Sequence, residues 1–281
     1  MYESFFGLRE MPFALTPNTR FFVAASSHRE ALELLTVGLA QGEGFLKISG
    51  EVGTGKTMLC RMLLNHLEGE AITAYLPNPQ LSPRGLYQAL ADELDIAGGH
   101  QGNTHLILRR ITRSLIQKTG QGQRVVLVID EAQAMAPATL EALRLLTNLE
   151  TESRKLLQVV LFGQPELDRV LDRDQLRQLK QRISFSCRLA ALTRDSVDAY
   201  LAYRMQQAGY NGEPVFTAAA IRAITRASRG IPRLINLLAH KSLLAAWGRG
   251  DYKVGRWHAR RATRDTESAR PPGLLGWGIL S

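Results

Sequence analysis

The chain has 281 residues with a formal net charge of +9, and its 45% hydrophobic and 22% charged residues are ordinary for a soluble globular protein larger than one average domain. No apolar run approaches the ~20 residues of a membrane-spanning helix, and the N-terminus lacks the basic start and apolar core of a signal peptide. The two cysteines, Cys60 and Cys187, lack the spacing of metal ligands, so the sequence disfavours a cysteine-bound metal and favours the reducing cytoplasm.

An irregular aromatic segment is predicted over residues 1–22. Its aromatic residues are Tyr2, Phe5, Phe6, Phe13, Phe21 and Phe22, and its prolines are Pro12 and Pro17. We expect this segment to lie over the following domain, where its rings fill core space or line an adenine pocket. Ser26-Ser27 then caps a helix that extends through Leu39, with His28 on the surface of the first turn.

A complete phosphate-binding-loop pattern, G-x-x-x-x-G-K-[ST], spans Gly50–Thr57. An apolar strand over 44–49 precedes it and helical apolar spacing over 58–64 follows it, as the motif requires. The glycines let backbone N–H groups form an anion-binding nest, to which the helix adds its positive end. Lys56 would reach the β- and γ-phosphates, and the Thr57 hydroxyl would ligate Mg²⁺. The predicted nucleotide contacts are Gly50, Glu51, Val52, Gly53, Thr54, Gly55, Lys56, Thr57 and Met58.

A pair of acids follows a buried strand further along the chain. The elements predicted between the loop and this strand are a strand over 71–76, a helix over 83–94 and a helix over 105–118. The aliphatic run over 124–129 then predicts a strand buried on both faces that ends in Asp130 and Glu131. Because open parallel sheets bind ligands at the carboxyl ends of their strands, Asp130 would hold the metal's hydration shell and Glu131 would polarise the attacking water.

A helix over 139–149 and a buried strand over 156–162 continue the alternation of helix and strand. The strand leads into Gln164, whose amide could contact the γ-phosphate or the attacking water, or could merely start a turn. The alternation predicts an α/β domain with a parallel sheet covered by helices on both faces.

Three cations lie on a short helix predicted over 176–183, just before a strand over 184–187. An arginine exposed there, with Arg182 first and Arg177 second, could enter a neighbouring subunit's site as an arginine finger. The pattern alone favours solvated arginines, so the finger is a hypothesis.

From residue 192 the sequence changes to helices joined by short turns. It predicts one helix from its cap Thr193 to Gln207, a second from its cap Thr217 to Ser228, and a third from Gly230-Ile231-Pro232 to Trp247. Arg233, just inside the third helix, would face the nucleotide if this helical domain closes over it. The predicted division is a nucleotide-binding domain over 1–190, a helical lid over 191–250 and a tail over 251–281.

The end of the sequence is basic. Its cations are Arg249, Lys253, Arg256, Arg260, Arg261, Arg264 and Arg270, against the acids Asp251, Asp265 and Glu267. Such a tail could meet nucleic acid, acidic lipid or an acidic protein surface, or it could simply be solvated. A short apolar stretch over 271–281 could touch a membrane or a partner, or it could be disordered.

With these elements in order, the chain resembles AAA+ ATPases over nearly its whole length. The resemblance gives Gly50–Thr57 as Walker A, Asp130-Glu131 as Walker B, Gln164 as sensor 1 and Arg233 as sensor 2. More narrowly, the chain resembles the MshM/ExeA family, and most of all its MshM branch. The motifs that carry this are Phe5-Phe6-Gly7-Leu8, Pro12-Phe13, Thr16-Pro17-Asn18, Asp130-Glu131-Ala132-Gln133, Phe162-Gly163-Gln164-Pro165-Glu166-Leu167 and Leu176-Arg177-Gln178-Leu179.

This resemblance implies a cytoplasmic, homo-oligomeric and ring-forming ATPase that uses ATP and Mg²⁺. It would assist assembly of an MSHA-type type IV pilus or of type II secretion machinery, with partners at the inner membrane. Members of the ExeA branch continue into a membrane span and a peptidoglycan-binding module, which this sequence does not contain. A DNA-associated ATPase of the transposition or origin-recognition type is the alternative.

Overall fold

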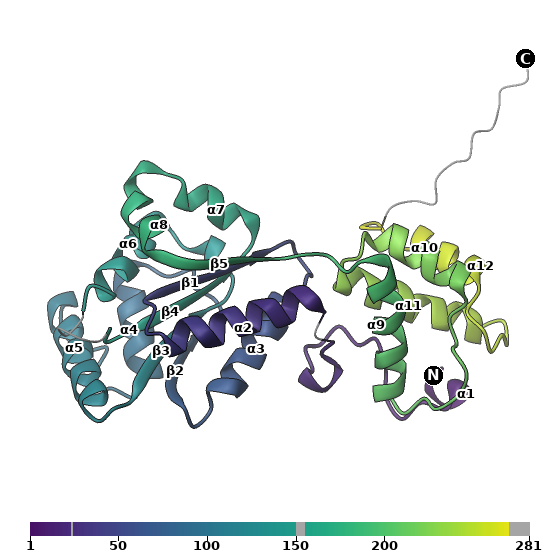
Figure 1. Cartoon of the computed structure of the whole chain (residues 1–281), viewed down its shortest axis with the longest axis horizontal. Helices are drawn as coiled ribbons and strands as arrows, with labels where there is room; N and C mark the ends of the chain where they lie inside the picture. Colours follow the sequence, from purple (N-terminus) through teal and green to yellow (C-terminus); the bar gives the residue numbers. More distant parts are fainter. Residues whose placement is uncertain (24, 150–154, 270–281) are drawn as a thin grey trace, which may run out of the picture. The chain divides into compact units, whose positions relative to one another are not determined.

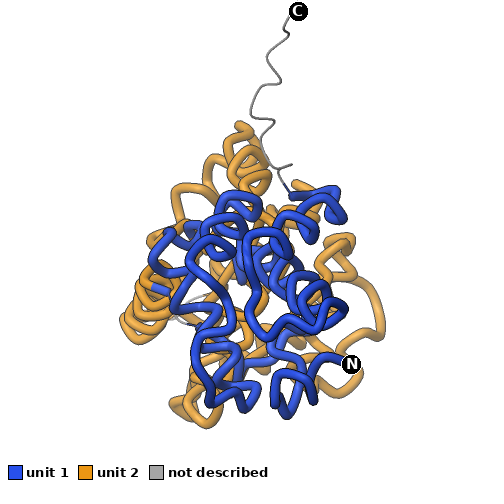
Figure 2. Tube along the Cα trace, turned by 90° about the vertical axis from the view of Figure 1, so that its right-hand side faces the viewer, with its two compact units in different colours: residues 1–25, 53–55, 190–281 blue, residues 26–52, 56–189 orange. Residues whose placement is uncertain are grey.

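The computed structural model describes residues 1–23, 25–149 and 155–269 (Figure 1). The short apolar end expected over 271–281 lies outside the described residues. The chain divides into two compact units, which Figure 2 shows in different colours. The sheet unit comprises Ser26–Val52 and Lys56–Leu189, and the helical unit comprises Met1–Ala25, Gly53–Gly55 and the chain from Ala190 onward.

Five parallel strands form the centre of the sheet unit. They are β1 (Phe45–Gly50), β2 (Ala71–Leu76), β3 (Arg124–Ile129), β4 (Gln158–Gly163) and β5 (Ile183–Leu189). Their order across the sheet is β2-β3-β4-β1-β5, and every neighbouring pair is parallel. The predicted parallel sheet is therefore confirmed, and β4 lies between the strand that precedes the phosphate loop and the strand that precedes the acids.

Helices cover both faces of this sheet. They are α2 (Ser26–Ala40), α3 (Lys56–Leu67), α4 (Pro83–Glu93), α5 (Thr104–Gly120), α6 (Pro137–Leu146), α7 (Pro165–Leu171) and α8 (Arg177–Arg182). On β3, Leu127 and Ile129 share an apolar core with α4, α5 and α6. The alternate residues Val126 and Val128 are also fully buried, on the opposite face. There α2 packs against β5 and α3 against β2 and β4 (Figure 1).

The helical unit has its own apolar core. Its helices are α1 (Glu3–Phe6), α9 (Arg194–Gln207), α10 (Ala218–Ser228), α11 (Pro232–Trp247) and α12 (Arg256–Arg264). Threonine side chains cap α9 and α10 as the sequence predicts, because Thr193 and Thr217 accept hydrogen bonds from Ser196 N and Ala220 N. Among the described residues, no helix combines the length and the apolar character that crossing a bilayer requires.

The N-terminal aromatic segment packs within the helical unit, whereas the sequence placed it with the nucleotide-binding domain. Tyr2 and Phe13 are each 1% exposed in a core shared with α9, α10 and α11. Arg204 of α9 donates through Nε to the carbonyl oxygen of Pro12 at 2.6 Å, and the Tyr2 hydroxyl lies 2.9 Å from Nδ1 of His240. These contacts bridge large sequence separations, so local patterns gave no signal for them.

Most of the expected tail is folded. α12 packs against α10 and α11, and its Ala259 is fully buried. The Gly255 N–H donates to Nδ1 of His258 at 2.9 Å, and Nε2 of the same ring lies 3.0 Å from Asp251 Oδ2. The sequence missed this helix because its buried face carries alanine and threonine, which give a weak apolar pattern.

Two local expectations are corrected. The sequence placed His28 on the protein surface, but it is only 3% exposed, so it lies on the buried face of α2. A further helix, α7, follows Gln164 directly, with Pro165 at its first position, where a missing N–H costs nothing. Gln164 therefore occupies a helix N-cap as well as a strand end.

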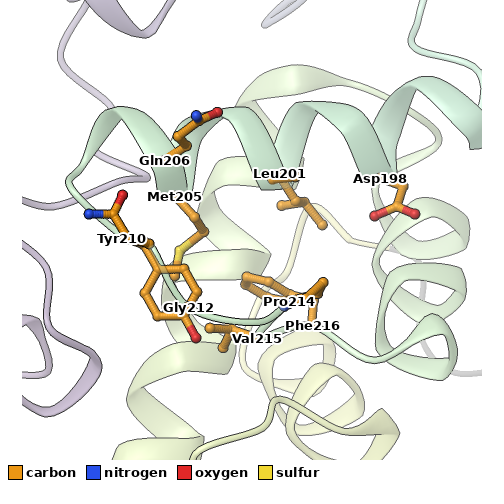
Figure 3. Close-up of a pocket in the computed structure, with 11 residues that line it drawn as sticks. Asp198, Leu201, Met205, Gln206, Tyr210, Gly212, Pro214, Val215 and Phe216 are labelled. Atoms are coloured by element: carbon orange, nitrogen blue, oxygen red, sulfur yellow. The ribbon is translucent and has the colours of Figure 1, made fainter.

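A cavity of about 380 Å³ lies inside the helical unit, between α9 and the segment over residues 210–216 (Figure 3). Leu201 and Met205 of α9 and Val215 and Phe216 of the segment give it an apolar wall. Asp198 and Gln206 lie along α9 in the same view (Figure 3). The cavity contains none of the predicted nucleotide contacts.

Gly230 provides a test of packing in the helical unit. Its φ is +78°, and a Cβ atom there would lie 2.2 Å from the carbonyl oxygen of Leu192. Gly230→Ala is expected to lower the free energy of unfolding by roughly 2–5 kcal/mol, because the left-handed backbone and the overpacking both cost energy. Gly250→Ala is the matched control, since Gly250 has a φ of +74° and no heavy atom within 4 Å. In urea denaturation, Gly250→Ala should lower the free energy of unfolding only by the cost of the left-handed backbone. Equal decreases in the two variants would contradict this account.

Candidate nucleotide-binding site

The phosphate loop joins the end of β1 to the start of α3, as predicted. Gly53 and Gly55 have φ angles of +82° and +101°, which L side chains rarely adopt. Glycine is therefore required at both turns of the loop. Because Lys56 is the first residue of α3, the loop's backbone amides lie at the N-terminus of a twelve-residue helix, an arrangement that favours phosphate.

Lys56 is held by the main chain of its own loop. Its side chain is 4% exposed, and Nζ donates to the carbonyl oxygens of Gly50 at 2.8 Å and Glu51 at 3.1 Å. Burial lowers the pKa of the ammonium group, and the nearby carboxylates of Glu131 and Asp130 oppose that shift. The lysine is thus a preoriented cation beside two acids.

Thr57 and Asp130 form an oxygen pair at the same place. The Thr57 hydroxyl donates to Asp130 Oδ2 at 2.8 Å, although the two residues are 73 positions apart. Asp130 is 3% exposed, and burial raises the pKa of its carboxyl group while the Thr57 hydrogen bond opposes the shift. A hydroxyl and a carboxylate oxygen are ligands that Mg²⁺ accepts, so the pair fits the predicted metal site.

Glu131 has an unusual backbone. Its φ is +52° and its ψ +37°, the left-handed region that is uncommon for a residue other than glycine. Its Oε2 accepts a hydrogen bond from Nε2 of Gln164 at 3.0 Å and another from Nε2 of Gln133. The structure thus brings Glu131 and Gln164 together and adds Gln133, a residue to which the sequence gave no role of its own.

Strand order explains why these residues meet. Asp130 and Glu131 follow β3, Gln164 follows β4, and the phosphate loop follows β1, so three neighbouring parallel strands deliver them to one edge of the sheet. Such an edge is the usual ligand site of open α/β sheets. Among the predicted site residues in the sheet unit, Lys56, Thr57, Asp130, Glu131 and Gln164 are brought together.

The two candidate finger arginines lie elsewhere in the sheet unit. Arg177 is the first residue of α8 and Arg182 is the last, and both side chains are exposed. Their neighbour Lys180 pairs with Asp172 at the surface. Both arginines are accessible to another molecule.

Arg233 lies against the turn of the phosphate loop. Its backbone N–H donates to the carbonyl oxygen of Gly53 at 3.1 Å, and a Cβ atom on Gly53 would lie 2.7 Å from Cβ of Arg233. By their contacts, residues Gly53–Gly55 belong to the helical unit, which also contains Arg233. The close approach gives Gly53 a second reason to be glycine.

The parallel sheet, the phosphate loop and the paired acids define the chain as a P-loop protein with the AAA+ ATPase fold. A family model described as an AAA domain matches residues 39–171. Cdc6p from Pyrobaculum aerophilum has a similar fold, with a TM-score of 0.67 and 20% identity over 94% of this chain and 70% of that one. The Aeropyrum pernix ORC2 protein gives a TM-score of 0.66 and 16% identity over 89% of this chain and 69% of that one. These low identities show the fold alone.

A relative of known name shares far more sequence. General secretion pathway protein A of Aeromonas hydrophila is 43% identical over 280 residues, which is the whole of this chain and 51% of that protein. The chain therefore spans about half the length of this relative. The similarity supports a relationship to the ExeA/GspA-like family, whereas the narrower resemblance to the MshM branch stays a prediction.

Proposed function

We propose that the protein is a Mg²⁺-dependent ATPase that serves type II secretion or the assembly of an MSHA-like type IV pilus. The observation that carries this is the meeting of Lys56, Thr57, Asp130 and Glu131 at one sheet edge. The relationship to General secretion pathway protein A supports the secretion setting. We place the protein in the cytoplasm, peripherally at the inner membrane, with the assembly machinery as its partner.

Each residue would contribute a separate part of the chemistry. The loop amides of Gly50–Thr57 and the Lys56 ammonium would bind the phosphates, since both direct positive charge at one point. Thr57 and Asp130 would hold Mg²⁺, which when bound supplies charge neutralisation across the phosphate oxygens. Glu131 would orient the attacking water, Gln164 would contact the γ-phosphate, and Arg233 would couple that contact to the helical unit as a lid.

Hydrolysis would take place between subunits of a homo-oligomeric ring. Arg182, with Arg177 second, would reach the site of a neighbouring copy, because both are exposed cations on α8. The ring and its fingers are proposals that rest on the AAA+ fold and on this exposure.

A direct assay tests the proposal. The wild-type protein should release phosphate from ATP with Mg²⁺ and should stop when EDTA is added. Absence of Mg²⁺-dependent turnover at high protein concentration would overturn the proposed function. The same assay should be run with and without DNA, although the structural relatives named above share too little sequence to favour a DNA substrate.

The basic helix α12 suggests which surface of the protein binds the membrane. On α12, Arg261 and Arg264 are exposed and Arg260 is partly exposed, whereas the opposite face packs on α10 and α11. We propose that this cationic face binds anionic lipid headgroups, each cation contributing about 1 kcal/mol near such a surface.

Reversing these charges should release the protein from anionic membranes. Replacing Arg260, Arg261 and Arg264 together by glutamate should weaken co-sedimentation with phosphatidylglycerol vesicles by at least a factor on the order of 100, while basal ATPase activity stays unchanged. The control places the same charge change on α5, at Arg109, Arg113 and Lys118. Equal losses in both variants would show that net charge alone, and not this face, drives the binding.

A further inference from the structure

The side chain of Gln133 bridges the ends of two neighbouring strands. Its Oε1 accepts a hydrogen bond from the backbone N–H of Gln164 at 2.9 Å, and its Nε2 donates to Glu131 Oε2. A backbone N–H can only donate, so it must face the amide oxygen of Gln133 and not its nitrogen. This contact fixes which way the Gln133 amide is turned, and its NH₂ group therefore faces the Glu131 carboxylate.

The same contacts determine which Glu131 oxygen remains available. Gln133 and Gln164 both donate to Oε2, and hydrogen bonds to a charged carboxylate are stronger than neutral ones. Two donors on Oε2 hold the carboxylate in one orientation and leave Oε1 to accept from a water molecule.

We infer that Gln133 is a positioning residue that holds Glu131 in the orientation needed to activate water. The inference rests on the proposed ATPase function and adds a residue to it. Gln164 is also the proposed γ-phosphate contact, so its amide NH₂, which has two N–H donors, would be shared with or drawn toward phosphate when nucleotide binds. Gln133 is anchored to the main chain, so it keeps the Glu131 carboxylate in place when Gln164 turns away.

Close packing at the end of β4 supports this bridge. Gly163 precedes Gln164, and a Cβ atom on it would lie 3.4 Å from Gln133 Oε1 and 2.6 Å from Leu167. A side chain at position 163 would therefore clash with Leu167 of α7, and it would meet Gln133 Oε1 at van der Waals distance. The segment that carries the bridge is thus closely packed.

Two substitutions separate positioning from simple structural support. Gln133→Glu keeps an acceptor for the Gln164 N–H but replaces the donor to Glu131 with a second carboxylate. Gln133→Leu removes both hydrogen bonds at similar size. If Gln133 positions Glu131, both variants should lower kcat about 10–100-fold with fluorescent-ATP affinity within about twofold of wild type. If Gln133 only supports the start of α7, Gln133→Glu should turn over at the wild-type rate, and the inference fails.

The two failures can be told apart. Wild-type protein without Mg²⁺-dependent turnover contradicts the proposed function, whereas active wild type with an equally active Gln133→Glu contradicts only the inference. In an inactive protein the bridge is tested by urea midpoints of Gln133→Leu, Glu131→Leu and the double variant. Strictly additive shifts would show that the two side chains do not interact and would overturn the inference in that case as well.

Discussion

Replacing Lys56 by alanine is expected to abolish ATP binding, whereas Glu131→Gln should bind ATP normally and lose turnover by a factor of about 10² or more. The reason lies in the two positions. Lys56 is a buried cation held at the loop, so its loss removes positive charge from the phosphate site. Glu131→Gln keeps the size of the side chain and removes only the charge that would activate water.

Titration with a fluorescent ATP analogue, run beside phosphate release, separates the two defects. Lys118→Ala on α5 is a matched control for loss of a lysine away from the loop, and it should behave as wild type. Equal loss of nucleotide affinity in the Lys56 and Glu131 variants would refute the separate roles assigned here.

Turnover should also depend on assembly. Arg182→Ala is expected to lower kcat by roughly 10³–10⁵, as for fingers supplied by a neighbouring molecule. Mixing it with inactive Glu131→Gln should restore activity, because roughly a quarter of heterologous interfaces in an equal mixture then pair an intact site with an intact finger. The measurement is phosphate release by each variant alone and by the mixture, over a range of protein concentrations.

The finger has its own controls. Arg173→Ala removes another exposed arginine near α8 and should leave turnover unchanged. Arg177→Ala tested in the same mixtures shows whether the second candidate supplies the finger. A specific activity independent of protein concentration, together with no rescue in any mixture, would exclude a finger in trans.

The sheet and the phosphate loop could be predicted because each is encoded over a few consecutive residues. The glycine spacing of Gly50–Thr57 and the aliphatic run before Asp130 carry their signal locally, and the parallel sheet they predict is confirmed. Helix caps such as Thr193 and Thr217 were equally readable, since the capping contact spans only three residues.

Features that depend on distant pairs of residues could not be predicted. The bridge from Gln133 to Gln164 exists only because β3 and β4 are neighbours, and no pattern around Gln133 reports that adjacency. The placement of the aromatic segment in the helical unit could not be predicted for the same reason, because its contacts lie far along the chain. The helix α12 was missed for a different reason, because its buried face gives a weak apolar pattern. Such arrangements follow from strand order and tertiary packing, which outweigh local propensity.

The sequence separation within the helical unit has a consequence for folding. The hydrogen bond between Arg204 and Pro12 joins residues 192 positions apart, and that between Tyr2 and His240 joins residues 238 apart. Closing such loops costs chain entropy before any contact compensates for it. At the usual rates of protein synthesis, on the order of 10–40 s pass between synthesis of the first aromatic residues and synthesis of their partners in α9. Until then their rings are exposed to other nascent chains, and the sheet unit, which is complete by Leu189, can fold first.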